Sequence, residues 1–518
     1  MVRTILSLTG IISLCFFLFA GEVVYQNNSG GLNSKSSPVF IDDSEATDLQ
    51  NINLDTDGAI AKRNGYTVLN TTLLQDQVDG LGTYRKVDGS LFMIAAAAKL
   101  YKMDDFDGTW DDITGTTTIT TENPVNFEVF EDTLIATNGQ DKVQEWDGTG
   151  VATDNDCDTD ISLTKAKYVE QFKNRLFLAN VTVSGTDYPS RAYFSDITDK
   201  DAWTTDSFIQ IGIDDGEVIT GMVHFADRLY FLKDNSIYRV RSTGDFDVPF
   251  SIEKTFATEG CIAPGSVQVF NNVIMAYSNK GFILFDGSRS EVISDKIRPT
   301  LDGLDRNNII NGKSGVFENL NQYWFSVADG DSGDCIIVYD YHNDAFLLHK
   351  GMSFNAMLSI LDSSNEERFY AGDFAGYVYR QDQGTDDYPL NVKTAIDAFY
   401  QTRNYTFDSY LFTKKAVHVV VLYEYQDNAT LNMNYTYDLS TQDWKLETLD
   451  QTPPGAKWDI AQWDIDVFSD TGASFHRFDL LSQGMALRLK FSNNTLGEQF
   501  KIYGWSIGYD EGSIIFNP

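Results

Sequence analysis

The residues with the clearest capacity for chemistry are the carboxylates of the loop Asp154–Asp160, whose sequence is DNDCDTD. Oxygen ligands that alternate in this way suit Ca²⁺, which binds about six to eight of them. The loop lacks the Gly and the closing Glu of an EF-hand, since Lys165 and Lys167 lie where that Glu would be sought. A solvated loop is therefore the favoured interpretation, and a Ca²⁺ site is the alternative.

Motifs of known enzyme classes are incomplete. The segment Asp105–Trp110 (DFDGTW) approximates the Asp box of sialidases but lacks its Ser and its spacing, which favours a turn that closes a strand. The 5 His residues are not paired at metal-ligand spacing. The 4 Cys residues lie far apart without a CxxC pair. We therefore expect no catalytic residues, no cofactor and no metal site.

Composition narrows the class of protein and the kinds of partner. The chain has 518 residues, enough for two or three domains, and its 13% aromatic content with many Thr, Val and Ile favours strands. Its 75 Asp plus Glu against 39 Lys plus Arg give a net charge of −36, which repels nucleic-acid phosphates and anionic membranes. An acidic wall would still let DNA slide past, but a solvated surface that keeps a large assembly soluble is the favoured explanation of the charge.

Residues 1–20 have the form of a secretory signal peptide. Arg3 precedes an apolar run, Ile5–Ala20, that is short for a membrane span. Leu18, at the −3 position before a cut after Ala20, is not the small residue that signal peptidase prefers. A misplaced start codon is the alternative, because Val23 or Val24 could be encoded by a late initiator.

From about residue 80 onward, one unit recurs: an apolar strand, a polar turn, a second apolar strand, another turn and a third strand. A period of about 40–50 residues is typical of β-propeller blades. The pattern predicts a propeller of about seven blades over residues 76–390. The units begin near Gly80, Asn126, Lys167, Val218, Gly265, Lys313 and Phe354.

Two further regions flank this propeller. Residues 391–518 contain longer alternating strands, such as Ala416–Tyr425 and Met485–Asn493, which predict a C-terminal β-sandwich. Residues 21–75 form an N-terminal arm rich in Gly, Asn and Asp. We expect one short helix in the arm at Ser44–Ile52, with Ser44 as its N-cap. The predicted fold class is therefore all-β.

The arm has the most specific sequence in the chain. Its segment Ser29–Tyr66, SGGLNSKSSPVFIDDSEATDLQNINLDTDGAIAKRNGY, resembles the opening of podovirus tail nozzle proteins, also called tubular tail protein B, tail hub or packaged-DNA stabilisation proteins. The order of motifs in Arg175–Trp203, Gly216–Asp245 and Gly260–Ile297 extends the resemblance along the propeller. The matching positions in the arm are Gly30, Gly31, Pro38, Ile41, Asp42, Asn51, Asn53, Asp55, Gly58, Lys62, Arg63, Gly65 and Tyr66.

The resemblance implies a structural virion protein: a homo-oligomeric ring, usually a hexamer, that lies below the tail adaptor and forms the distal channel for DNA ejection. Tail fibres or spikes would be further partners, genomic DNA a transient cargo, and membranes no partner unless the leader is retained. Arm and sandwich would supply the contacts between rings. The interface residues expected by resemblance are Gly30, Gly31, Pro38, Lys62, Arg63 and Tyr66.

The signal-like leader departs from this family pattern, because tail proteins assemble in the host cytoplasm. The alternative is therefore a secreted or periplasmic β-propeller that acts as an adhesin or a carbohydrate-binding module. A glycan-degrading enzyme is the third hypothesis.

Overall fold

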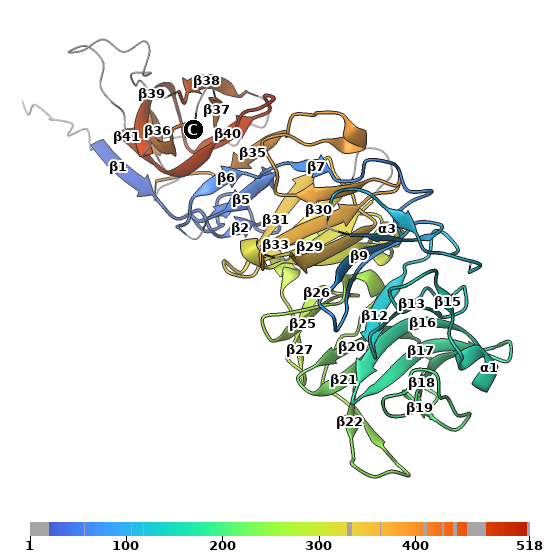
Figure 1. Cartoon of the computed structure of the whole chain (residues 1–518). Helices are drawn as coiled ribbons and strands as arrows, with labels where there is room; N and C mark the ends of the chain where they lie inside the picture. Colours follow the sequence, from blue (N-terminus) through green and yellow to red (C-terminus); the bar gives the residue numbers. More distant parts are fainter. Residues whose placement is uncertain are drawn as a thin grey trace, which may run out of the picture.

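The computed structural model describes residues 20–55, 57–104, 106–117, 119–328, 334–362, 364–407, 412–426, 429–438, 443–452 and 473–514. Strands dominate it, and they form a propeller with a sandwich beside it (Figure 1). The predicted all-β class is confirmed. Residues 1–19, which carry nearly all of the signal-like leader, lie outside the described residues.

The propeller consists of seven four-stranded sheets within the described ranges. The first strand of a blade packs against the first strand of the next blade. This holds along the series β8, β12, β16 and β20 and along the series β24, β28 and β32, and β32 contacts β8 to close the ring. In each blade the strands are given from axis to rim. The first three blades are: first, β8 (Gly80–Arg85), β9 (Leu91–Ala96), β10 (Leu100–Met103) and β11 (Asp111–Asp112); second, β12 (Asn126–Phe130), β13 (Thr133–Thr137), β14 (Gln144–Trp146) and β15 (Thr153–Asp154); third, β16 (Leu163–Phe172), β17 (Arg175–Val183), β18 (Thr186–Phe194) and β19 (Phe208–Gln210). The other four are: fourth, β20 (Ile219–Phe225), β21 (Arg228–Lys233), β22 (Ile237–Ser242) and β23 (Phe250–Lys254); fifth, β24 (Gln268–Phe270), β25 (Val273–Ser278), β26 (Gly281–Phe285) and β27 (Ser290–Val292); sixth, β28 (Lys313–Phe317), β29 (Gln322–Val327), β30 (Cys335–Asp340) and β31 (Ala345–Lys350); seventh, β32 (Ala356–Leu361), β33 (Glu367–Gly372), β34 (Val378–Gln381) and β7 (Tyr66–Val68).

Tight turns explain why the repeat is visible in the sequence. Four blades join their first two strands through two residues that both have positive φ, the geometry of a type I′ turn. Asn and Asp tolerate that conformation and therefore recur at these positions. The turn pairs are Glu131-Asp132, Lys173-Asn174, Ala226-Asp227 and Asn271-Asn272.

The described helices are short and lie between strands. They are α1 (Cys157–Ile161), α2 (Arg298–Asp302) and α3 (Arg306–Ile310), with the 3₁₀ turns η1 (Pro264–Ser266), η2 (Ser294–Ile297), η3 (Glu318–Leu320) and η4 (Pro389–Asn391). Among the described residues, no helix has the length and apolar character needed to cross a membrane.

Two sheets form the C-terminal sandwich, and both include strands from the arm. One sheet has the order β39-β36-β41-β6-β5, with β1 also paired to β41, and the other has the order β38-β37-β40-β35-β4. The bounds are β1 (Ala20–Tyr25), β4 (Asp48–Gln50), β5 (Ile52–Leu54), β6 (Ile60–Lys62), β35 (Ala398–Gln401), β36 (Phe412–Glu424), β37 (Thr430–Tyr437), β38 (Lys445–Asp450), β39 (Ala473–Gly484), β40 (Leu487–Asn493) and β41 (Lys501–Ile514).

The arm is therefore not a separate unit. Its strand β7 completes the last blade against β34, while β1, β4, β5 and β6 enter the sandwich. The helix expected at Ser44–Ile52 is wrong, because this segment forms β3 (Glu45–Ala46), β4 and the start of β5, and β2 (Gly31–Leu32) pairs with β3. Pairing of β4 with the distant strand β35 satisfies backbone groups that a local helix would otherwise satisfy.

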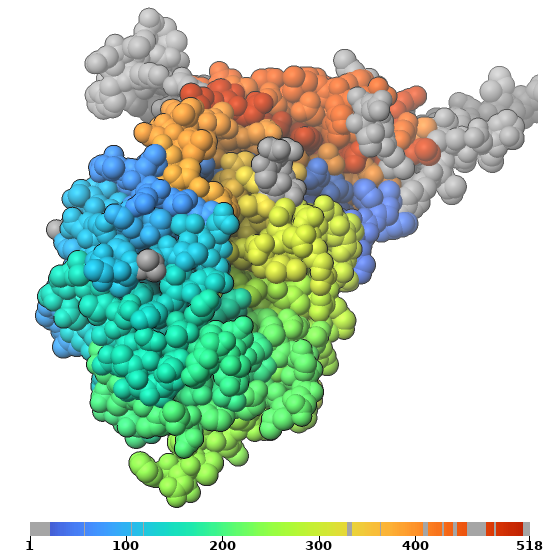
Figure 2. Space-filling view, turned by 90° about the vertical axis from the view of Figure 1, so that its right-hand side faces the viewer, coloured from blue at the N-terminus to red at the C-terminus, as the bar shows by residue number. Residues whose placement is uncertain are grey.

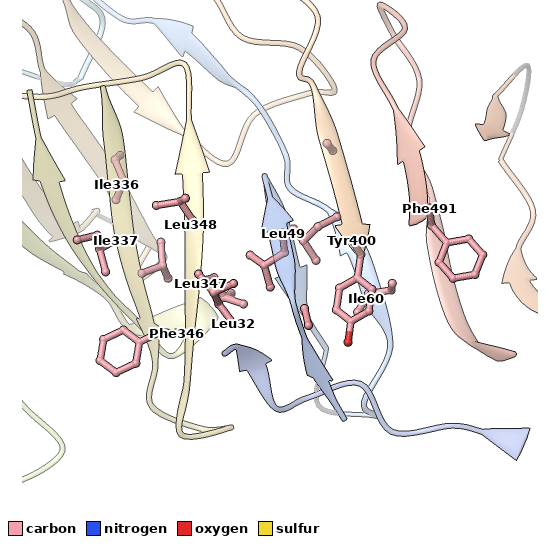
Figure 3. Packing of buried hydrophobic residues seen from close by; sticks show 14 of the residues in the cluster. Leu32, Leu49, Ile60, Ile336, Ile337, Phe346, Leu347, Leu348, Tyr400 and Phe491 are labelled. Carbon is pink, nitrogen blue, oxygen red and sulfur yellow. The ribbon is translucent and has the colours of Figure 1, made fainter. Parts of the chain in front are cut away.

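Apolar side chains of the arm fill the space between the propeller and the sandwich. Leu32, Leu49 and Ile60 are almost fully buried, and they lie between Phe346–Leu348 of the sixth blade and Tyr400 with Phe491 of the sandwich (Figure 3). The space-filling view shows the sandwich (orange to red) lying across one side of the propeller, with arm residues in dark blue at the contact (Figure 2). One hydrophobic cluster thus extends from the fifth, sixth and seventh blades through the arm into the sandwich.

Candidate functional site

The first half of the arm motif packs within the protomer. A Cβ on Gly30 would lie 2.6 Å from Ser44 Oγ, and a Cβ on Gly31 would lie 2.7 Å from the carbonyl oxygen of Phe346. Gly31 also has a φ of +66°, which favours glycine. The carbonyl of Pro38 accepts a hydrogen bond from the backbone of Asn404 at 2.8 Å. These glycines are therefore required by close contacts inside one chain.

The two basic residues of the motif are buried and bonded inside the same chain. Arg63 donates two hydrogen bonds to the Asp387 carboxylate, at 2.8 and 2.6 Å, and these side chains are 3% and 7% exposed. Lys62 Nζ donates to Asn493 Oδ1 and to the carbonyl of Glu498, both at 2.9 Å. Burial lowers the pKa of Lys62 to about 8.

Tyr66 lies at the same contact of the arm with the rest of the chain. Its ring packs edge-on against Phe354 at 5.7 Å and against Tyr379 at 5.0 Å, and burial raises its pKa. The expectation that Lys62, Arg63 and Tyr66 face another subunit is therefore corrected, because they fasten the arm to the propeller and the sandwich of their own chain. The sequence did not reveal this role because Asp387, the partner of Arg63, is 324 residues away.

A cavity of about 330 Å³ lies where the first strands of the blades converge on the propeller axis. Lys167 of β16 and Lys313 of β28 both line it, together with Asn126 of β12 and Asn311. Lys313 Nζ donates to the carbonyl of Asn311 at 2.7 Å. Burial lowers the pKa of Lys167, and it lowers that of Lys313 to about 8.

Asp79, at the entrance to the first blade, borders the neighbouring cavity, which Lys313 also lines. Its carboxylate accepts hydrogen bonds from Gln77 Nε2 at 2.7 Å, Asn355 Nδ2 at 3.1 Å and the backbone of Glu122 at 3.0 Å. Burial raises the pKa of Asp79. This carboxylate is thus held by neutral donors, and no lysine lies within 4.0 Å of it among the described residues.

A second cavity on the axis, of about 320 Å³, carries carboxylates instead of lysines. Glu128 of β12 and Glu170 of β16 line it. Burial raises the pKa of Glu128 to about 7, and burial together with the charge of Glu128 raises that of Glu170 well above its usual value. The axis therefore has one cavity lined by two lysines and another lined by two carboxyl groups whose protonated forms are favoured by burial.

Lys167, Lys313, Glu128 and Glu170 are not among the site residues expected from the sequence, although the positions of three of them in the repeat point to the axis. Lys167 and Lys313 mark the starts of two predicted units, and Glu128 follows the start of another by two residues. The first strand of each blade lines the propeller channel, and side chains two apart share a face. Charged residues at alternate positions of each unit's first strand would have indicated the axis.

The acidic loop considered for Ca²⁺ is occupied by contacts within the chain. Lys142 Nζ lies 3.2 Å from Asp154 and 2.7 Å from Asp158, and Asp160 accepts a hydrogen bond from the backbone of Trp203 at 3.0 Å. In the described ranges, no group of three or more His, Cys, Asp or Glu residues is placed to hold a metal ion.

The DFDGTW segment is only partly described, because Asp105 lies outside the described residues. Asp107 accepts a hydrogen bond from the backbone of Thr109 at 2.8 Å, and Gly108 has a φ of +89°. These are features of a turn.

The outer face of the sandwich carries a groove of about 360 Å³. Phe399 and Trp444 line it together with the amides of Asn432 and Asn434, which lie two residues apart on β37. Lys490 Nζ lies 3.8 Å from the centre of the Phe399 ring. Aromatic rings beside amides and a cation form a surface that suits polar ligands with an apolar face.

No protein-family model matches the chain, and no curated protein matches it. It is similar in structure to BamB from Moraxella catarrhalis, at 12% identity over 71% of this chain and 100% of that chain, with a TM-score of 0.38. It is also similar to YCF48 from Cyanidioschyzon merolae, at 10% identity over 61% of this chain and 98% of that chain, with a TM-score of 0.38. The Pan2 WD40 domain of Neurospora crassa matches at 8% identity over 64% of this chain and 98% of that chain, also with a TM-score of 0.38. At such values we base no functional inference on these similarities.

Proposed function

We propose that the chain is the tail nozzle subunit of a short-tailed bacteriophage, which assembles into a homo-oligomeric ring and forms the distal channel for DNA ejection. The observation that carries the proposal is the arm. The segment that resembles nozzle proteins, Ser29–Tyr66, is also the segment whose strands β4 to β7 join the sandwich to the propeller. A rigid joint of this kind suits a subunit that must keep its shape while DNA passes.

Charge supports the same proposal. A net charge of −36 repels the phosphates of DNA, so DNA in the channel would be a transient cargo and not a tightly bound ligand. In this proposal the ring is a hexamer in the virion, with the tail adaptor above it and fibres or spikes around it.

Contacts between subunits must come from surfaces other than the buried arm residues. Phe40 of the arm is 76% exposed, and Phe475 on β39, at the edge of its sandwich sheet, is 72% exposed. Exposed aromatic side chains and strand edges are typical of surfaces that associate. We assign the intersubunit contacts to these exposed surfaces of the arm and the sandwich.

Native mass spectrometry and electron microscopy of the purified protein test the proposal. A closed ring of identical subunits supports it, and a chain that stays monomeric at all concentrations contradicts it. The variant Phe40→Ser/Phe475→Ser should shift the ring toward monomers. Phe246→Ser is the matched control, since Phe246 is 88% exposed in the fourth blade, far from the arm, and this change should leave the ring intact.

A second candidate function is a secreted or periplasmic carbohydrate-binding module or adhesin, and the groove lined by Phe399 and Trp444 favours it. Aromatic rings stack on the apolar faces of sugars while amides bond to their hydroxyl groups. A glycan array with the wild type and a Phe399→Ala variant tests this function. A monomer that binds a glycan through Phe399 would favour it over the nozzle.

A further inference from the structure

Several buried cations in this protein lie beside a carboxylate. Lys233 is fully buried and lies 2.6 Å from the Asp215 carboxylate, and Arg63 pairs with Asp387. Lys167 and Lys313 differ, because neither has a carboxylate within 4.0 Å in the part of the chain that the structure describes. For Lys167 Nζ, no hydrogen-bond acceptor is in reach among those residues, and its nearest ring is Tyr168, centred 5.6 Å away.

The two lysines face one cavity from different blades. Lys167 comes from the third blade and Lys313 from the sixth, and the cavity of about 330 Å³ between them is also lined by Asn126 and Asn311. A lysine that loses water without gaining a partner costs free energy, and the cost grows when a second positive charge is near. Among the described residues, Lys313 has only the carbonyl of Asn311 as a partner. In a chain with almost twice as many acidic as basic residues, two neighbouring lysines without a carboxylate within 4.0 Å in the described ranges are therefore unexpected on stability grounds.

The acidic groups nearby make no ion pair with the lysines within 4.0 Å in the described ranges, although the charge of Asp79 raises the pKa of Lys313 against the effect of burial and Glu122 lines the cavity. Asp79 is already bonded to Gln77, Asn355 and the backbone of Glu122. Glu122 itself is exposed and makes no ion pair within 4.0 Å among the described residues. The cavity is thus open to an anion from outside the chain.

We propose that the axial cavity between Lys167 and Lys313 binds a small oxyanion, a carboxylate or a phosphate group. Such an anion would receive charge-assisted hydrogen bonds from both ammonium groups, which are stronger than those between neutral groups. The amide of Asn311 and the open volume allow a ligand somewhat larger than the anion alone, since small-molecule sites begin at about 300 Å³. The inference goes beyond the proposed nozzle function and does not depend on ring formation.

Isothermal titration calorimetry and thermal-shift measurements on the full chain test the inference with two ligands, inorganic phosphate and glucuronate. Saturable binding of either one supports it: binding of phosphate alone would indicate a phosphate ligand, and binding of glucuronate alone an acidic sugar. Loss of one charge-assisted bond should weaken binding about tenfold or more in Lys167→Gln and in Lys313→Gln.

Lys99→Gln is the matched control, because Lys99 pairs with Asp112 on the exposed rim of the first blade and should not affect binding. Circular dichroism checks that each variant is folded. Failure of both ligands to bind the wild type at millimolar concentration would overturn the inference, and so would binding that is unchanged in folded Lys167→Gln and Lys313→Gln. Either result would leave the nozzle proposal untouched, because the ring is measured separately.

Discussion

At the scale of single residues, buried charges in this protein fall into two groups with opposite consequences. Arg63 and Asp387 are both almost fully buried and share two hydrogen bonds, with Asn51 accepting a third from Arg63 at 2.9 Å. Glu128 and Glu170 at the axis are enclosed without a cation within 4.0 Å in the described residues. Removing one member of a buried pair is costly, whereas neutralising an unmatched carboxylate is not.

Arg63→Met should therefore lower the free energy of unfolding by about 3–5 kcal/mol, because it leaves the Asp387 carboxylate buried without its partner. Chemical denaturation followed by circular dichroism measures the change. The exposed pair Arg477–Asp479 provides the control, and Arg477→Met should change stability by about 0–1 kcal/mol. Equal losses in the two variants would show that burial of the Arg63 pair has no special importance.

Glu128 should make stability depend on pH in the opposite direction to a paired carboxylate. Burial raises its pKa from 4.5 to about 7, so the folded protein keeps a proton that the unfolded chain releases. The stability that this group contributes is thus present below pH about 4.5 and is lost as the pH rises to about 7. The side chain of Glu128→Gln stays neutral at every pH. The free energy of unfolding of this variant should therefore rise relative to that of the wild type as the pH increases from 4.5 to 7, by at most about 3 kcal/mol.

Melting temperatures of both proteins from pH 4.5 to 8 measure this difference. Glu291→Gln is the control, since Glu291 is exposed on β27 and its replacement should give the same difference from the wild type at every pH. A pH-independent difference for Glu128→Gln would contradict the burial of this carboxylate.

The scale of single residues is also where the sequence was least informative. Gly30, Gly31 and Lys62 were recognised as special, but their contacts are made by residues far along the chain, such as Phe346 and Asn493. Local sequence cannot identify such partners. The motif therefore indicated which residues matter without indicating that they act within one chain.

At the scale of elements, prediction succeeded where a structure depends on local residues. The two-residue turns with Asn or Asp, such as Lys173-Asn174, fix hairpins by their own φ values, so each blade leaves a trace in the sequence. The arm strands leave none, because β4 is only three residues long and is defined by its pairing with β35. For the same reason a helix was wrongly expected at Ser44–Ile52.

Gly65, immediately before β7, tests how tightly the arm is held against the propeller. A Cβ at this position would collide with the backbone carbonyl of Asp386, so Gly65→Ala should lower the free energy of unfolding by about 1–3 kcal/mol or more. Gly303→Ala is the control, because the nearest atom to a Cβ there is 3.4 Å away and the backbone has no positive φ. Thermal unfolding of both variants measures the contrast, and equal melting temperatures would show that the contact at Gly65 can relax without cost.

At the scale of the whole molecule, the hydrophobic cluster joins regions that the sequence places in separate units. Leu49 of the arm, Trp324 of the sixth blade and Trp505 of the sandwich belong to the same cluster. Elements that share one core unfold together, so the sandwich and this part of the propeller should melt in a single transition. A nozzle subunit that transmits force between its neighbours would benefit from this coupling.

Leu49→Ala tests the coupling directly. It removes a fully buried side chain that contacts both sides, and it should destabilise both by the same amount, about 2–5 kcal/mol. Fluorine NMR of protein labelled with fluorotryptophan follows Trp324 and Trp505 separately, and both signals should shift to the same lower midpoint. Leu446→Ala, at a side chain that is 58% exposed on β38, should move neither. If the Trp505 signal melted earlier than that of Trp324 in the wild type, the sandwich would be an independent domain, and the arm would be a tether between two bodies instead of part of a common core.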